Sequence, residues 1–296
     1  MTKNVLTRPD ALAGASAKGS SVSRAASLSA DNYAAISRFL ESQAGIRLGN
    51  GKEYLVTSRL NRLLAEFGLS DFEQLSAGLS GIGNRRLQGA VIDAMTTNET
   101  FWFRDGAHYR ALTHGILREQ GLGRVRIWSA AASTGQEIYS IAVSLQDAMR
   151  DGTLPRSLRY EILGTDISPS ALAQAKSARY CGVSASRGLT EDQRRKYFLS
   201  EQDCIEVRPE YRAGISLREF NLMNSFEGLG RFDVIFCRNV LIYFSQERKR
   251  DIVERFARSL NPGGYLFLGS TESMSEHADL FEMKNLHGAL AFCRRS

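Results

Sequence analysis

The spacing of apolar residues divides the chain into three parts. Residues 1–30 are rich in Ala and Ser and contain no aromatic side chain. A segment with so little apolar surface cannot offset the entropy lost on folding, so we expect a disordered tail there. Residues 31–95 carry apolar positions at helical spacing, which predicts a small N-terminal helical domain. In residues 96–296 short apolar runs alternate with helical patterns, which predicts a second, larger domain.

The expected N-terminal domain contains four short helices. Asp31 is expected to cap the first helix and Asp71 the third, and residues 84–95 form the last. The second helix carries the clearest apolar stripe, formed by Val56, Leu60, Leu63, Leu64 and Phe67. A domain of about 65 residues is near the lower limit for folding alone, so we expect it to dock on the larger domain.

Strands and helices alternate in the larger domain from residue 124 onward. We expect strands at 125–130, 160–165, 215–220, 232–237, 264–269, 281–285 and 289–294, and helices at 135–149, 168–178 and 246–260. This alternation predicts an α/β fold with a mostly parallel sheet. Leu286-His287-Gly288 joins the last two strands as a hairpin, so one strand there must be antiparallel. Residues 184–214 interrupt the alternation with a short helix and a small β excursion, which we interpret as an inserted β-subdomain.

Charge and cysteine content narrow the possible partners and compartment. The net charge of +6 favours an anionic partner: nucleic acid, an acidic membrane face or an acidic protein. Cys181, Cys204, Cys237 and Cys293 form no CxxC pair and have no histidine at metal-ligand spacing, so we expect reduced thiols and no metal site. No apolar run approaches the roughly 20 residues that cross a bilayer. No secretory signal is visible either, so we expect a cytoplasmic protein without membrane insertion.

The expected strand at 125–130 is followed by a turn of small residues, Ala130–Gly135, where backbone N–H groups can approach a ligand closely. The turn is not GxGxxG, so a dinucleotide-binding loop is a poor match. Glu137 then places a carboxylate at the start of a helix, where a diphosphate would need positive potential. Glu137 therefore suits a cationic ligand, or it is an ordinary first-turn acid favoured by the helix dipole.

Asp166 follows the expected strand at 160–165. A carboxylate at this place can accept hydrogen bonds from both hydroxyls of a ribose. Ser168 is better placed as the cap of the following helix, with Pro169 at its first position, so Asp166 is free for a ligand. Asn221 follows the next strand, where it could read the edge of a base or close a turn.

Arg238, Asn239 and Tyr243 follow the expected strand at 232–237. Arg238 lies in an apolar stretch and needs a partner, which favours a functional role over a solvated charge. Ligands of open α/β sheets bind beyond the carboxyl ends of parallel strands, so these residues and Asp166 are expected to share one crevice. No Ser-His-Asp or Cys-His constellation is apparent, so histidine-based catalysis is not expected.

Three motifs of this chain, in this order, resemble those of the bacterial chemotaxis receptor methyltransferases, the CheR family. They are Thr96-Thr97-Asn98-Glu99-Thr100 with Phe103-Arg104, then Trp128–Glu137, then Phe236–Phe244. Tyr197-Phe198 and Asn261-Pro262-Gly263-Gly264 also fit, and the resemblance covers about residues 31–296. The family commonly has Glu-Glu-Pro after the glycine of the second motif, where this chain has Gln136-Glu137-Ile138.

The resemblance implies a Rossmann-like methyltransferase sheet and an S-adenosylmethionine-dependent protein-glutamate O-methyltransferase that modifies chemotaxis receptors for sensory adaptation. The cofactor S-adenosylmethionine, and its product S-adenosylhomocysteine, would be held by Asn98, Thr100, Arg104, Glu137, Asp166, Asn221, Leu222, Arg238 and Asn239. Arg104 and Arg238 would hold carboxylates of the cofactor or of the incoming glutamate. Tyr243 would orient the attacking oxygen.

The expected partner is the cytoplasmic helical domain of a receptor, bound by a monomer. Receptor methylation sites lie on acidic helices, which the basic flank of Arg59 and Arg62, with Arg47 and Lys52 nearby, could receive. Those arginines are equally consistent with an ordinary solvated helix face. In some members the inserted subdomain tethers a receptor tail peptide; around Ser200–Asp203 it is compact here.

The chemistry of a glutamate acceptor agrees with the absence of a histidine constellation. A glutamate side chain has a pKa of about 4.3, so it is ionised at neutral pH and needs no general base. The transfer is an in-line displacement at a sulfonium methyl, so catalysis must come from positioning and fixed electrostatics.

Other functions are open to a chain of this kind. A nucleic-acid methyltransferase should show an Asn/Asp-Pro-Pro-aromatic motif, whereas this chain has Arg238-Asn239-Val240-Leu241. A methyltransferase acting on another protein is a further alternative. A cofactor-responsive signalling module would keep Asp166 but lose Arg104, Arg238 and Tyr243, all of which are present. A nicotinamide oxidoreductase is disfavoured because the glycine fingerprint is absent.

Overall fold

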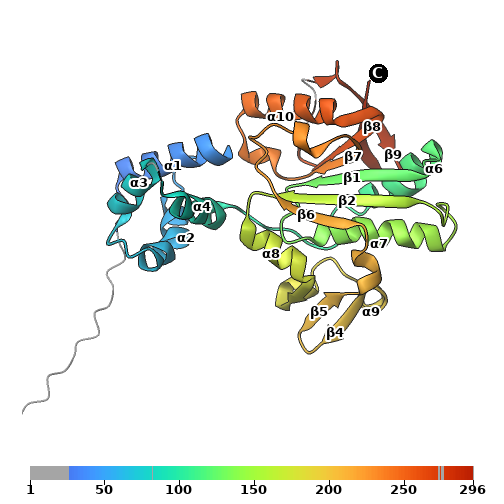
Figure 1. The fold of residues 1–296 in the computed structure, drawn as a ribbon, viewed down its shortest axis with the longest axis horizontal. Coiled ribbons are helices and arrows are strands. Elements are labelled where there is room, and N and C mark those ends of the chain that lie inside the picture. Colours follow the sequence, from blue (N-terminus) through green and yellow to red (C-terminus); the bar gives the residue numbers. More distant parts are fainter. Residues whose placement is uncertain (1–26, 82, 273, 275–276, 296) are drawn as a thin grey trace, which may run out of the picture.

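The computed structural model of the chain describes residues 27–81, 83–272, 274 and 277–295. Most of the tail expected at 1–30 therefore lies outside the described residues. The N-terminal domain consists of α1 (Ala30–Ala44), α2 (Glu53–Glu66), α3 (Phe72–Ser80) and α4 (Arg85–Met95), as predicted (Figure 1). Its first cap is Ser29, whose hydroxyl accepts from Asn32 N at 3.2 Å, and not the expected Asp31. Regular structure thus begins before residue 31.

The larger domain is built on a seven-stranded sheet. Its strands are β1 (Arg124–Ala130), β2 (Arg159–Asp166), β6 (Ile215–Glu219), β7 (Phe232–Cys237), β8 (Leu260–Leu268), β9 (Phe281–Leu286) and β10 (Ala289–Arg294), in the order β6-β2-β1-β7-β8-β10-β9. The pairs β6–β2, β2–β1, β1–β7 and β7–β8 are parallel, and β10 is antiparallel to both neighbours. The predicted fold class is confirmed.

Helices cover both faces of this sheet. The predicted helices are α7 (Gln136–Arg150), α8 (Pro169–Ser177) and α10 (Gln246–Ser259). A segment outside the predicted elements is also helical: α5 (Ala107–Arg110), the π-helix η1 (Ala111–Ile116) and α6 (Leu117–Gln120). The short 3-10 turns η4 (Glu227–Leu229) and η5 (Leu241–Tyr243) flank β7. Figure 1 shows α10 on one side of the sheet and α7 on the other.

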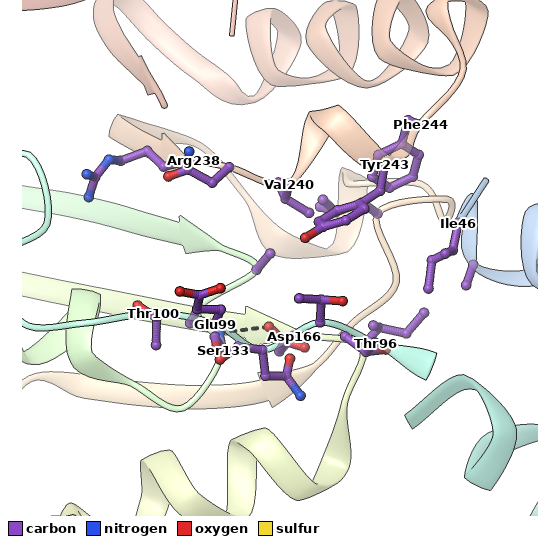
Figure 2. Close-up of a pocket in the computed structure, with 18 of the residues that line it drawn as sticks. Ile46, Thr96, Glu99, Thr100, Ser133, Asp166, Arg238, Val240, Tyr243 and Phe244 are labelled. Carbon is purple, nitrogen blue, oxygen red and sulfur yellow. Dashed lines mark hydrogen bonds between the residues drawn. The ribbon is translucent and has the colours of Figure 1, made fainter. Parts of the chain in front are cut away.

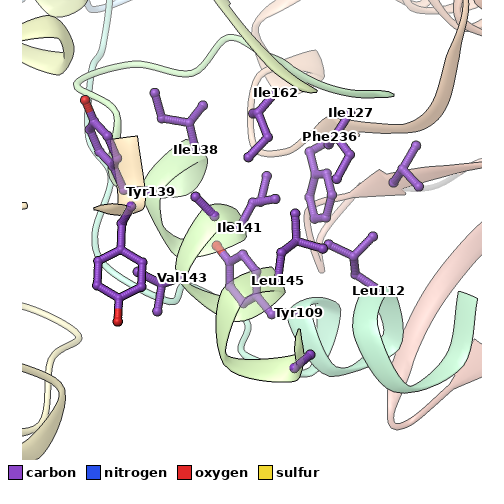
Figure 3. Packing of buried hydrophobic residues seen from close by; sticks show 14 of the residues in the cluster. Tyr109, Leu112, Ile127, Ile138, Tyr139, Ile141, Val143, Leu145, Ile162 and Phe236 are labelled. Carbon is purple, nitrogen blue, oxygen red and sulfur yellow. The ribbon is translucent and has the colours of Figure 1, made fainter. Parts of the chain in front are cut away.

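Alternate residues of the central strands feed two separate cores, as the pleat requires. Ile127 of β1 packs with Phe236 of β7 and Leu145 of α7 on one face (Figure 3). Trp128, the next residue of β1, packs with Phe256 of α10 on the other face. All five side chains are fully buried. Burial on both faces of the middle strands is what rigidly holds their carboxyl ends.

The insertion forms a separate antiparallel sheet of order β3-β5-β4. Its elements are β3 (Arg179–Cys181), η2 (Gly182–Ala185), α9 (Glu191–Tyr197), β4 (Phe198–Glu201), β5 (Cys204–Val207) and η3 (Pro209–Arg212). The sheet takes in β3, which precedes the expected range 184–214. Trp102, from the segment between the domains, is buried against Tyr180 and Phe198, with ring centroids 4.9 and 4.7 Å away.

A disulfide joins Cys181 of β3 to Cys204 of β5, so the expectation of four reduced thiols is wrong for this pair. The two cysteines are 23 residues apart and face each other in antiparallel register. This juxtaposition depends on strand pairing, which residue spacing alone does not reveal. Cys237 and Cys293 are free and buried. Burial raises the pKa of the Cys237 thiol well above its ordinary value, which agrees with a small core residue.

The helical domain docks on the carboxyl edge of the sheet, as its small size predicts. The backbone N–H of Arg47 donates to the carbonyl of Tyr243 at 3.0 Å. The carboxylate of Asp93 accepts hydrogen bonds from the hydroxyls of Ser168 (2.5 Å) and Ser170 (2.9 Å) at the start of α8. The domain interface therefore borders the strand ends that carry the candidate site.

The glycine that ends α1 is expected to be essential for this docking. Gly45 has φ 70°, and a Cβ there would lie 2.3 Å from the Phe244 ring. Gly68 has φ 67° with nothing within 4 Å of a built Cβ. Both alanine variants carry the same backbone cost, so Gly45→Ala should lose about 1–3 kcal/mol more unfolding free energy than Gly68→Ala. Urea unfolding of the two variants measures this difference, and equal losses would contradict the proposed crowding.

A buried histidine gives the fold a specific pH dependence. His108 in α5 is packed against Phe267, and burial, with the nearby charge of Arg238, lowers its pKa to about 4. As the pH falls, His108 therefore binds a proton in the unfolded chain at a higher pH than in the folded chain. The contribution of the neutral, buried histidine to the unfolding free energy is fully present above pH 6.5 and is lost as the pH falls toward 4. We expect protonation of this histidine to lower the unfolding free energy by about 2 kcal/mol between pH 7.5 and pH 5. His108→Gln should lack this increment in urea unfolding; an unchanged pH profile would contradict it.

Candidate functional site

A cavity of about 340 Å³ lies beyond the carboxyl ends of β1, β2, β6 and β7. This volume is within the range of small-molecule sites. The helical domain closes one side of the cavity through Ile46–Gly49, and the segment Thr96–Phe101 between the domains lines it as well. The larger domain contributes Ala131–Ser133, Asp166, Phe220–Leu222 and Arg238–Val240, one group after each strand.

Every residue predicted to contact the cofactor lines this one cavity. They are Asn98, Thr100, Arg104, Glu137, Asp166, Asn221, Leu222, Arg238 and Asn239, and Tyr243 joins them. Figure 2 shows Tyr243 on one side of the cavity and Asp166 and Ser133 on the other. The individual roles of these residues are predictions.

Asp166 is fixed by the backbone but keeps capacity for a ligand. Its Oδ2 accepts from Ser133 N at 2.7 Å and its Oδ1 from Ser168 N at 2.9 Å. As predicted, Ser168 caps α8, accepting from Ala171 N at 3.0 Å. Burial raises the pKa of the Asp166 carboxyl, although the two N–H bonds oppose the shift. Each oxygen retains a lone pair, so the carboxylate can still accept from a ribose hydroxyl.

Left-handed backbone conformations gather in the loops around the cavity. Phe103 (φ 50°) and Asp105 (φ 53°) lie before α5, Ala131 (φ 63°) and Ser133 (φ 52°) follow β1, and Asn239 (φ 59°) follows β7. Each such non-glycine residue costs about 1–3 kcal/mol and persists only where its surroundings enforce it. Strain of this kind is typical of pre-shaped ligand sites.

Arg238 is the centre of a buried charge network. Its Nη1 lies 2.9 Å from Glu137 Oε2 and its Nη2 lies 2.7 Å from Asp105 Oδ2, and its side chain is only 2% exposed. Nη2 also donates to the carbonyl of Arg104 at 2.6 Å. Burial alone would lower the pKa of Arg238, but Tyr109, Glu137 and Asp105 together raise it above its usual range. Arg238 is therefore permanently charged.

This network changes the expected role of Arg238. Both terminal nitrogens hold carboxylates of the protein, so they are not available to a carboxylate of a ligand as the sequence suggested. Glu137 is fixed from two sides, because Ser129 Oγ also donates to its Oε1 at 2.7 Å. Glu137 lies in the first turn of α7 and also lines the cavity, so both of its predicted interpretations agree with the structure.

Arg104 also lines the cavity, and its guanidinium is not enclosed by an ion-pair network as that of Arg238 is. It makes no hydrogen bond or ion pair with a residue that the structure describes, and its Cζ lies 5.3 Å from the centroid of the Phe101 ring. Arg187 of the insertion contacts the same ring at 4.8 Å and pairs with Glu99 at 2.8 Å. The inserted subdomain thus supports the aromatic platform on which Arg104 lies.

Asn221 closes a turn and joins the two domains. Its Oδ1 accepts from Met223 N at 2.9 Å, and its Nδ2 donates to the carbonyl of Gln43 at 2.6 Å. Of the two interpretations left open by the sequence, the structure favours the turn. The side chain still borders the cavity.

The structure separates the two arginines expected to receive an acidic helix. Arg59 donates to the carbonyls of Met95 (2.8 Å) and Thr96 (3.2 Å) and to the Thr97 hydroxyl (3.2 Å). It holds the segment between the domains and is not the free flank that the sequence suggested. Arg62 is exposed.

Two acids that the sequence analysis missed shape this site. Asp105 forms an ion pair with Arg238. It is the residue after Arg104, the last residue of the first motif. Glu272 accepts from the backbone N–H groups of Asn239 and Leu241, both at 2.8 Å. Glu272 follows β8 as other polar residues of the site follow β6 and β7, so its place after a strand is the signal that points to it.

Family comparisons agree with this geometry. Residues 98–289 match the model described as "CheR methyltransferase, SAM binding domain", and residues 31–96 match "CheR methyltransferase, all-alpha domain". The chain belongs to the CheR methyltransferase family. It is an S-adenosylmethionine-dependent methyltransferase, as the resemblance implied.

Relatives of known name cover most of this CheR-family chain. It is 43% identical over 264 residues to the "Chemotaxis protein methyltransferase" of Vibrio parahaemolyticus, covering 88% of this chain and 95% of the relative. It is 41% identical over 252 residues to "Chemotaxis protein methyltransferase 1" of Pseudomonas aeruginosa, covering 83% and 91%. It is 35% identical over 262 residues to the Escherichia coli "Chemotaxis protein methyltransferase", covering 87% and 89%.

The residues around the cavity fit S-adenosylmethionine. Within the described ranges, Arg238 Nε and Asn239 Oδ1 are buried without a hydrogen-bond partner. Small residues after β1 leave room for a ligand, and the fixed acid Glu137 suits its positive charge. The described residues contain no group of three or more His, Cys, Asp or Glu that could hold a metal. Of the helices described, none has the length and apolarity to cross a membrane.

Proposed function

We propose that this methyltransferase modifies glutamate side chains of chemotaxis receptors, forming glutamyl methyl esters that adapt the sensory response. The names of its relatives support this acceptor. The observation that carries the proposal is the presence of Arg104, a guanidinium that forms no ion pair with a described residue, at the same cavity as Tyr243. A cation and a hydroxyl donor are the groups that a carboxylate acceptor needs.

The acceptor itself requires no proton removal, because its carboxylate is already ionised at neutral pH. No histidine is among the described residues that line the cavity. The bound cofactor supplies an electrophilic methyl group on a sulfonium and leaves as S-adenosylhomocysteine. The task of the protein is therefore to align the carboxylate oxygen with that methyl and to exclude water.

Arg104 holds a carboxylate in this proposal, either that of the methionyl part of the cofactor or that of the incoming glutamate. The hydroxyl of Tyr243 donates a hydrogen bond to the attacking oxygen and so orients that oxygen. The Tyr243 side chain faces the cavity (Figure 2). Arg238 acts indirectly in this proposal, because its ion pair with Glu137 holds that carboxylate in place for a cationic ligand. The carboxylate of Asp166 accepts hydrogen bonds from the ribose hydroxyls of the cofactor.

The acceptor helix docks on the basic edge of the helical domain beside the cavity mouth. Arg62 and Lys52 are exposed, and Lys52 and Arg47 line the cavity. Arg47 is exposed too, although it lies 3.4 Å from Glu41. Such a surface suits the acidic cytoplasmic helices of a receptor. In this proposal the enzyme binds them as a monomer in the cytoplasm, and it requires neither nucleic acid nor membrane insertion.

Methylation should weaken with salt if this docking is electrostatic. Raising NaCl from about 0.1 M to about 0.5 M shortens the screening length, so the KM for receptor should rise several-fold while kcat changes little. Initial rates at a range of receptor concentrations measure this. A receptor KM that does not respond to salt would argue against a docking surface made of Arg62 and Lys52.

The acceptor is tested by incubating the enzyme with methyl-labelled S-adenosylmethionine and membranes that contain chemotaxis receptors. Label should enter the receptor polypeptide and should disappear when the membranes lack receptors. Replacing the labelled glutamates by alanine in the receptor should remove the signal. Label in nucleic acid or in an unrelated protein, with none in the receptors, would contradict the proposed acceptor.

A further inference from the structure

Glu272 lies where the fifth parallel strand of the sheet ends, next to the loop that carries Arg238. β8 and β7 are parallel neighbours, with Leu268 of β8 in register with Cys237 of β7. After Leu268 the chain turns at once, and Glu272 N donates to the Gly269 carbonyl at 2.9 Å. This turn directs the Glu272 carboxylate back toward the loop after β7.

The carboxylate of Glu272 accepts three hydrogen bonds from backbone donors of two loops. Its Oε2 accepts from Asn239 N at 2.8 Å and from Gly269 N at 2.7 Å, and its Oε1 accepts from Leu241 N at 2.8 Å. Hydrogen bonds to an ionised acceptor are about twice as strong as neutral ones. A Cβ at Gly269 would lie 2.5 Å from Asn239 Nδ2 and 2.9 Å from Glu272 Oε2, so only glycine permits this approach.

The loop held in this way carries Arg238, Asn239 and Tyr243, which line the cavity. Asn239 has a left-handed backbone with φ 59°, a strained conformation that needs support. Leu241 begins the 3-10 turn that ends at Tyr243. Glu272 does not line the cavity, whereas Arg238, Asn239 and Tyr243 do. Its contribution to the site is therefore the shape of the loop.

We propose that Glu272 is a positioning residue for methyl transfer, whose carboxylate presets the Arg238–Tyr243 loop in the conformation that binds S-adenosylmethionine. Glu272 does not act as a base in this proposal, because it does not line the cavity and its carboxylate binds the backbone of the loop. The inference rests on the cofactor-dependent methyl transfer of this family and not on which protein accepts the methyl group.

The test measures cofactor affinity without any acceptor. Glu272→Gln keeps the shape of the side chain but has one acceptor oxygen and places an NH₂ group against a backbone N–H. Its affinity for S-adenosylhomocysteine, measured by calorimetry, should fall about tenfold to a hundredfold. Glu282→Gln is the matched control, since Glu282 is an exposed glutamate of β9 that pairs weakly with Lys284 at 3.7 Å; its affinity should equal that of the parent.

Loss of folding must be separated from loss of loop shape. The Glu272→Gln variant should keep its far-ultraviolet circular dichroism at the assay temperature, and acetate added to Glu272→Ala should restore part of the cofactor affinity. Affinity of Glu272→Gln within twofold of the parent would overturn the proposal. A loss of affinity that only accompanies unfolding would also overturn it. Should Glu272→Ala fail to fold, the Gln variant and its control decide. Failure of receptor methylation would leave these binding results unaffected.

Discussion

Replacing Arg238 by alanine is expected to reduce methyl transfer at least about a hundredfold and to destabilise the fold at the same time. The substitution leaves Glu137 and Asp105 without the cation that lies 2.9 and 2.7 Å from them. Breaking a buried ion pair in this way typically costs about 3–5 kcal/mol, because uncompensated charge remains. Urea unfolding and initial rates of methylation on the same preparation measure both effects.

Two variants separate the structural contribution of Arg238 from its charge. Arg238→Lys keeps a positive charge but cannot reach both acids with a planar fork, so it should recover part of the stability and little of the activity. Combining Arg238→Met with Glu137→Gln removes charge from both partners, so it should be less destabilised than the sum of the single variants. Activity of Arg238→Ala within a few-fold of the parent would contradict the network.

Replacing Arg104 by alanine should show the opposite pattern, a large loss of activity with little loss of stability. Arg104 makes no ion pair with a described residue, its Cζ lies 5.3 Å from the centroid of the Phe101 ring, and its charge acts on Glu99 only through space. Its removal should therefore change the unfolding free energy by no more than about 1 kcal/mol. Loss of one charge-assisted contact to a carboxylate should reduce kcat/KM about a hundredfold.

The kinetic constants of Arg104→Ala also show which carboxylate it holds. A raised KM for S-adenosylmethionine indicates the methionyl carboxylate of the cofactor, whereas a lowered kcat at saturating cofactor indicates the incoming glutamate. Arg110→Ala is the control, because Arg110 is an exposed arginine of α5 away from the cavity lining. Equal effects of the two substitutions would contradict a ligand-binding role for Arg104.

Local sequence patterns predicted the elements and the strand-end residues of this protein well. Asp166 ends a strand, and Asn221, Arg238 and Asn239 follow strands, that are apolar enough to be recognised. Parallel pairing brings the carboxyl ends of these strands together. Ser168 with Pro169 formed a sufficient capping signal for α8. The side chains of these residues therefore meet at one cavity because the fold class fixes which ends of the strands coincide.

Contacts that depend on the pairing of distant segments could not be predicted in this way. The helical spacing of the apolar residues places Arg59 on the exposed face of its helix. In the structure its guanidinium donates to carbonyls at the start of the segment that joins the domains. Cys181 and Cys204 face each other only because β3 and β5 pair in that register. Whether Arg238 binds a ligand or a protein acid depended on Asp105, whose left-handed backbone no residue pattern signals.

The chemical nature of the bond that the enzyme forms shows whether a carboxylate is the acceptor. Receptor labelled with methyl-labelled S-adenosylmethionine is treated with mild alkali, and volatile methanol is collected. The label should be released as methanol, and peptide mass spectrometry should find the methyl group on glutamate side chains. A label that survives alkali would indicate N-methylation and would contradict methyl transfer to a carboxylate at the Arg104 and Tyr243 site.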